Sequence, residues 1–256
     1  MLTLAAIVDT LFHILWAALR VGGMVMVAPV FGAMFVPTRL RLLITLVLSF
    51  AMLPAVGPLP AYSPLSLQGL LAVGQELVVG VAIGFLLKIA IEAAVIGGQI
   101  VSSGTGLSFA MVVDPQSGGI PLLGRFYLII ATLLMLALNA HLQLIQVLAA
   151  SFALVPIGSG GIHATDLRLV ADFAGLMFLG AVKLALPSVV AMLMVNVAFG
   201  VISRAAPTLN LFAVGFPITM LMGFLVILMD IGSHGPIWQA QLTETFSAIN
   251  RLLAGG

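Results

Sequence analysis

Charged residues are almost absent from long stretches of this 256-residue chain. Residues 184–203 and 205–229 carry no charge at all, and each stretch is long enough to cross a bilayer, which needs about 20 apolar residues. Soluble domains carry roughly 25% charged residues. This chain carries 7%, which is too little to coat a soluble globule of its size. The sequence therefore predicts an integral membrane protein.

The apolar residues form about six long segments that we expect to be helices. Glycine and proline inside them, such as Gly97, Gly98 and Pro187, favour kinks or breaks, which membrane helices tolerate where protein covers the freed backbone groups. The string GVAIG at 80–84 is typical of a close helix contact through small residues. No soluble domain or clear repeat intervenes, so we expect one all-α membrane domain over 1–256. The segments are 8–35, 40–56, 67–96, 125–155, 168–203 and 208–231.

Several charged residues nevertheless lie inside or beside the apolar segments, where each costs about 2.5–3.5 kcal/mol on insertion scales. Such groups are usually paired, placed at segment ends or buried against a neighbouring subunit. We favour these roles over an ion relay, because no ladder of Asp, Glu and His follows one face. Lys88 and Glu92 are four residues apart and can pair on a helix. The predicted assembly residues are Arg20, Glu76, Lys88, Glu92 and Arg204.

Several function classes find no support in the residues. The chain has no cysteine, which excludes disulfides and thiolate metal sites, and its four histidines are scattered. No zinc-protease, nucleophile-elbow or phosphate-loop motif is present. The net charge of +1 gives no basic face for nucleic acid. We therefore predict a protein that is not an enzyme and needs no cofactor, metal or nucleic acid.

The string GTGLSFAMVVDPQSGG at 104–119 is unusual for such a chain. Glycines give its two ends backbone freedom, and Asp114-Pro115 ends any helix, but its middle is apolar. A flexible loop with an apolar middle can fill a channel and keep it dry, as hydrophobic constrictions do. The alternative is a re-entrant packing loop with no gating role. The predicted gate residues are Gly104, Gly106, Leu107, Ser108, Phe109, Ala110, Met111, Val112, Val113, Asp114, Pro115, Gln116, Ser117 and Gly118.

Four blocks of the sequence, 20–41, 104–126, 139–158 and 186–224, carry distinctive strings of residues. In order and wording they resemble the FliR family of flagellar biosynthetic proteins, which includes counterparts in virulence type III secretion. The departures are small: Ala140 stands where the family usually has glycine, and Thr208 where glutamine is common. The most unusual string is GLSF followed by DPQSG. The blocks are RVGGMVMVAPVFGAMFVPTRLR (20–41), GTGLSFAMVVDPQSGGIPLLGRF (104–126), NAHLQLIQVLAASFALVPIG (139–158) and LPSVVAMLMVNVAFGVISRAAPTLNLFAVGFPITMLMGF (186–224).

The resemblance implies an export-gate subunit at the flagellar basal body in the bacterial inner membrane. It implies a FliP-like part followed by a FliQ-like part, and partners that are FliP-like, FliQ-like, FlhA-like and FlhB-like proteins, surrounded by membrane lipid. The substrates are unfolded flagellar proteins, and the resemblance places the pore-closing plug in 104–119. The same subunit of a virulence system stays an alternative, as does a scaffold with no moving part. A secondary transporter is less favoured, because Asp114 is the lone acid of its loop.

Overall fold

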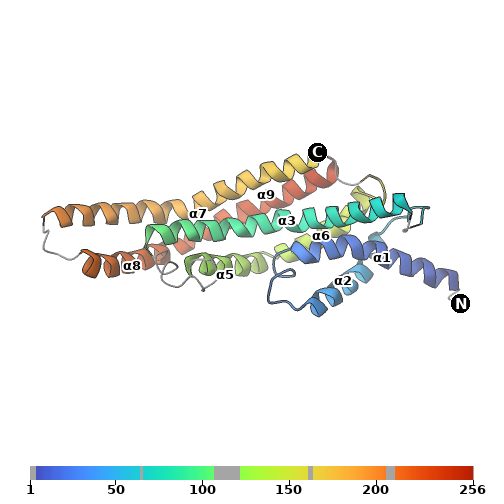
Figure 1. Cartoon of the computed structure of the whole chain (residues 1–256), viewed down its shortest axis with the longest axis horizontal. Helices are drawn as coiled ribbons and strands as arrows, with labels where there is room; N and C mark the ends of the chain where they lie inside the picture. Colours follow the sequence, from blue (N-terminus) through green and yellow to red (C-terminus); the bar gives the residue numbers. More distant parts are fainter. Residues whose placement is uncertain (1–3, 64–65, 107–121, 161–163, 206–210, 256) are drawn as a thin grey trace. The chain divides into compact units, whose positions relative to one another are not determined.

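The computed structural model describes residues 4–63, 66–106, 122–160, 164–205 and 211–255. These residues form helices and short 3-10 turns, and none of the described residues lies in a strand (Figure 1). Five helices are long and apolar enough to cross a membrane, and the count rises to six when one bent pair is taken as a single span. The predicted all-α membrane fold is therefore confirmed.

The helices follow one another along the chain with few long connections. The elements are α1 (Leu4–Val27), α2 (Thr38–Met52), the 3-10 turn η1 (Leu53–Ala55), α3 (Leu67–Gly104), α5 (Leu122–Ala137), α6 (Ala140–Leu154), α7 (Ala164–Ala205), α8 (Leu211–Asp230), the 3-10 turn η3 (Ile231–Ser233) and α9 (His234–Ala254).

The helices depart most clearly from the predicted segments at four places. Helix α1 ends at Val27, although its segment was predicted to continue to residue 35. The predicted segment 125–155 is two helices, α5 and α6, bent by 63° at a break where Asn139 adopts a left-handed φ of 56°. Helix α3 continues to Gly104, beyond the predicted end at residue 96. Helix α9 was not predicted, because polar residues on its exposed face hide the apolar pattern of its buried face.

The helices run without interruption through glycines that we expected to break them. Gly97 and Gly98 lie inside α3. A Cβ on Gly98 would lie 2.9 Å from the Cα of Gly124 in α5, and a Cβ on Gly97 would lie 3.2 Å from the carbonyl oxygen of Ala181 in α7. Pro187 likewise lies inside α7. The prediction of breaks was wrong here, because these glycines let neighbouring helices approach closely.

The chain divides by its internal contacts into two compact units. Unit 1 comprises Met1–Ile89, Asn139–Ala174 and Leu242–Gly256, and unit 2 comprises Ala90–Leu138 and Gly175–Gln241.

In unit 1, helices α1 and α3 touch backbone to backbone. A Cβ on Gly80 would lie 2.8 Å from the carbonyl carbon of Arg20, and a Cβ on Gly84 would lie 2.8 Å from the carbonyl oxygen of Met24. The atoms that these Cβ groups would meet belong to the backbone of α1, which cannot move aside as the end of a flexible side chain can. The predicted small-residue contact at 80–84 is thus confirmed, and its partner is α1.

Large apolar side chains cover the exposed faces of several helices. On α8, Leu228 and Met229 are 70% and 85% exposed, and α2 and α7 carry similar rows. A water-soluble surface rarely holds apolar patches this large. These faces suit contact with lipid or with other protein chains.

Candidate functional site

The described part of the predicted gate is its N-terminal stem, Gly104 to Gly106. Residues 107–118 lie outside the described residues. Helix α3 ends at Gly104, and the Thr105 amide still donates to the Val101 carbonyl at 3.1 Å. Gly106 then adopts φ +76°, a left-handed conformation that glycine reaches without a Cβ penalty. Glycine therefore ends the helix here, eight residues beyond the end at residue 96 that the sequence predicted.

The stem is packed between two other helices of unit 2. Thr105 is 1% exposed and contacts Gly223 of α8. A Cβ on Gly104 would lie 3.8 Å from the Cβ of Met192 in α7. The Asn196 side chain donates to the Gly104 carbonyl at 3.5 Å, the long limit for a hydrogen bond. Sequence analysis did not identify these partners, because residues so far apart in the chain leave no local pattern.

Two of the predicted assembly residues, Arg20 and Glu76, pair with each other inside unit 1. Arg20 in α1 is 0% exposed and Glu76 in α3 is 2% exposed. The Arg20 Nε donates to Glu76 Oε2 at 2.8 Å, and Nη2 donates to Oε1 at 3.1 Å. This two-bond geometry matches the planar guanidinium to the carboxylate.

The remaining Arg20 donors bind the C-terminal end of α6. Nη1 donates to the Ser151 carbonyl at 2.7 Å and to its hydroxyl at 3.0 Å, and Nη2 donates to the Val155 carbonyl at 2.7 Å. The guanidinium also lies 4.4 Å from the ring centroid of Phe152. All five N–H donors of an arginine are therefore used. Arg20 caps α6 from another helix, where a cation also complements the helix dipole.

The other predicted assembly residues lie nearer the surface. Lys88 and Arg204 are exposed and Glu92 is half-buried. Within the described ranges no ion pair includes any of the three, so the Lys88–Glu92 pair that the spacing allows is not formed. Arg204 occupies the last turn of α7, as expected for a charge at a segment end. A role in subunit contact stays a prediction for all five residues.

A second buried polar cluster lies in unit 2, where α8 turns into α9. Asp230 accepts from the Ser188 hydroxyl at 3.2 Å and from the Ser233 hydroxyl at 2.7 Å. His234 is 3% exposed, and its Nε2 lies 3.8 Å from Asp230 Oδ2. Its ring meets Tyr127 edge-on at 5.2 Å between centroids. Among the described residues neither nitrogen of His234 has a hydrogen-bond partner.

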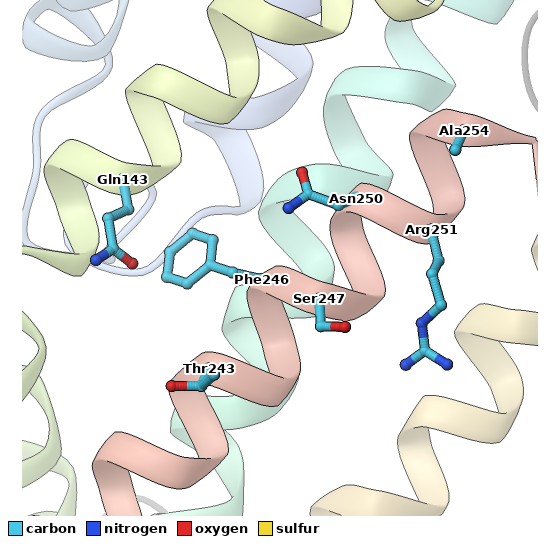
Figure 2. A pocket seen from close by; sticks show the side chains of 7 residues that line it. All are labelled: Gln143, Thr243, Phe246, Ser247, Asn250, Arg251 and Ala254. Carbon is cyan, nitrogen blue, oxygen red and sulfur yellow. The ribbon is translucent and has the colours of Figure 1, made fainter.

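An open groove of about 610 Å³ follows α9 in unit 1. Figure 2 shows that its polar side chains do not converge: Arg251 points away from Gln143, and Phe246 lies between Gln143 and the axis of α9. No group of three metal-ligating side chains occurs in the part of the chain that the structure describes. Neither observation indicates a small-molecule or metal site.

The family model for bacterial export proteins, family 1, matches residues 11–245. The chain belongs to this family. It is 32% identical over 242 residues to the flagellar biosynthetic protein FliR of Escherichia coli (strain K12), covering 93% of this chain and 92% of that protein. It is 28% identical to FliR of Aquifex aeolicus (strain VF5) over 87% of this chain and 86% of that one. Identity to FliR of Bacillus subtilis (strain 168) is 26%, with 97% of each chain covered. The resemblance that the four sequence blocks carry is therefore confirmed.

Proposed function

We propose that this chain is a subunit of the flagellar type III export gate in the bacterial inner membrane. The observation that carries the proposal is the match to a FliR protein over nine-tenths of both chains, with the family model spanning residues 11–245. The relatives named above are all flagellar, which favours the flagellar over the virulence apparatus. An export role also fits a chain whose residues offer no catalytic constellation.

Within that gate, residues 106–118 act as a plug that closes the pore for unfolded flagellar proteins. Support comes from the apolar middle of this string, Leu107 to Val113, and from the packed stem at Thr105. Closure must be favourable by only a few kcal/mol, because an entering substrate has to displace the plug. Apolar side chains that exclude water from the pore can supply a closure of this modest free energy.

The partners are FliP-like and FliQ-like subunits, with FlhA-like and FlhB-like proteins acting on the same gate. The apolar faces of α2, α7 and α8 need lipid or protein to cover them, which supports residence in a membrane assembly. The exposed charges Lys88 and Arg204 and the half-buried Glu92 supply polar contacts to those subunits. Arg20 and Glu76 contribute to the same assembly from inside the chain, because their buried pair holds α1, α3 and α6 in the shape that the subunits meet.

The test is deletion of residues 106–118 in a reconstituted complex. The complex is purified through the FliP-like subunit, and leak of a small dye and of ions is measured in liposomes. We expect the deleted chain to co-purify as the intact chain does. If the closed state holds about 99% of the population, its loss raises the leak about 100-fold.

Graded variants sharpen the same experiment. Phe109→Ala and Met111→Ala remove apolar volume without shortening the chain, so we expect them to leak less than the deletion. A deleted complex that assembles normally and stays as tight as the intact one would show that the segment is packing alone. A folded monomer that binds no FliP-like or FliQ-like subunit would refute the export-gate proposal itself.

A further inference from the structure

The end of α3 is held by two helices that sequence analysis did not connect with the gate. Met192 of α7 is 1% exposed, and its Cβ would lie 3.8 Å from a Cβ on Gly104, while Gly223 of α8 contacts Thr105. Asn196 of α7 adds a long hydrogen bond to the Gly104 carbonyl. All of these residues belong to unit 2. The position from which the chain leaves α3 is thus set from two sides.

Thr105 has little freedom to adjust. Its hydroxyl donates to the Ser102 carbonyl at 3.1 Å, which fixes the side-chain rotamer and directs the methyl group toward α8. A β-branched side chain has few alternative χ1 states, and Thr105 is almost fully buried. Movement at α8 is therefore transmitted to the backbone at Thr105 rather than absorbed by its side chain.

Position 223 accepts only glycine in this arrangement. A Cβ placed there would meet the Thr105 methyl group well inside contact distance and would lie 3.0 Å from the Thr105 Cβ. On the other side, the Met192 sulfur lies 3.7 Å away, an ordinary contact. An added methyl group at 223 must therefore displace Thr105, and with it the first turn after α3.

We propose that the contact between Thr105 and Gly223 is a clamp that positions the stem of the plug. Thr105 and Gly223 are positioning residues: they set where residue 106 leaves α3, and so how the plug meets the pore. The proposal rests on the proposed function, since it assigns the clamp to the closed state of the same gate. Displacing α8 relative to α3 would release the clamp, so α8 is the element through which a neighbouring subunit can open the gate.

The clamp is tested by a cycle of two substitutions in the reconstituted complex. Gly223→Ala should raise dye leak about tenfold, because overpacking against a rigid neighbour shifts the stem. Thr105→Ser removes the clashing methyl group and keeps the hydroxyl that binds Ser102. The double variant Thr105→Ser, Gly223→Ala should therefore return the leak close to the wild-type level. Gly200→Ala is the matched control, because an added Cβ at that helical glycine of α7 has open space.

The outcomes separate the clamp from the plug. A tight Gly223→Ala complex beside a leaky deletion of 106–118 would overturn the clamp and leave the plug standing. If both stay tight, the plug fails together with the clamp, while assembly with the FliP-like and FliQ-like subunits still tests the export-gate role. A Gly223→Ala leak that Thr105→Ser does not reduce also overturns the clamp, because the strain then acts elsewhere. Should Gly223→Ala not assemble, Thr105→Ala loosens the contact without adding atoms, and a tight assembled Thr105→Ala complex overturns the clamp.

Discussion

The two buried polar clusters of this protein differ in how completely their polar groups are hydrogen-bonded. In unit 1, every donor of Arg20 has a partner, and the Glu76 carboxylate is bound through both oxygens. In unit 2, Asp230 is bound by two hydroxyls, but the neighbouring His234 leaves both ring nitrogens without a partner among the described residues. A fully satisfied network holds one arrangement of helices, whereas an unsatisfied buried group costs free energy. The first cluster therefore fixes packing more firmly than the second one.

The largest effect should come from breaking the satisfied cluster at its centre. Arg20→Ala leaves a buried carboxylate on Glu76 and removes the donors from the end of α6, a change that costs about 3–5 kcal/mol for buried pairs. We expect faster amide exchange over 140–155 and less assembled complex, both measured by mass spectrometry on the purified gate. Arg39→Ala, which removes an exposed arginine of the same unit, is the control and should change neither.

A paired replacement sharpens this result. Arg20→Met with Glu76→Leu removes both charges, so no lone charge stays buried and most of the stability should return. Recovery should be incomplete, because the Ser151 and Val155 carbonyls lose the arginine that capped them. Full recovery would show that the ion pair, and not the helix cap, accounts for the role of Arg20.

The sequence predicted only part of the cluster around Arg20. Local patterns show where a charge lies in an apolar segment, but they do not show which helices meet. The cost of charge in an apolar segment singled out Arg20 and Glu76 as residues for subunit assembly, and the structure buries both. Sequence analysis did not pair them, because 56 residues separate them and nothing local records which helices meet. For the same reason Ser151 and Phe152 were missed: a serine and a phenylalanine in an apolar helix look like ordinary packing residues.

The fold, too, was predicted only where local patterns were sufficient. Apolar runs predicted most of the long helices, since length and hydropathy decide which segments cross a membrane. They did not predict the bend at Asn139, because a left-handed residue between two apolar helices does not interrupt hydropathy. They also misread the glycines of α3 as breaks, because only the neighbouring helix shows whether a glycine supplies flexibility or space. At the gate, sequence identified the stem glycines but not Gly223, for the same reason.

A smaller effect is expected at the edge of the satisfied cluster. Ser151→Ala removes the hydroxyl that accepts from Arg20 Nη1 at 3.0 Å, but the Ser151 carbonyl still accepts from the same nitrogen at 2.7 Å. The hydroxyl also donates to the Leu148 carbonyl at 2.7 Å, so the substitution removes two hydrogen bonds. Each such loss costs about 1 kcal/mol, and the arginine nitrogen stays satisfied. Exchange over 140–155 should therefore rise far less than in Arg20→Ala. An effect as large as that of Arg20→Ala would mean that the serine, and not the ion pair, holds α6.

The smallest effect should come from the unsatisfied cluster, at His234. Phenylalanine has nearly the same ring, keeps the edge-on contact with Tyr127, and removes two buried nitrogens that have no hydrogen-bond partner among the described residues. Replacing an unpaired buried polar group by an apolar one of similar shape is close to neutral, so His234→Phe should change stability by less than about 1 kcal/mol in either direction. Amide exchange over 226–240 in the intact complex reports this directly. A loss of several kcal/mol, matched by Asp230→Asn, would instead show a charged imidazole paired with Asp230 across the 3.8 Å contact, and the two clusters would then be alike.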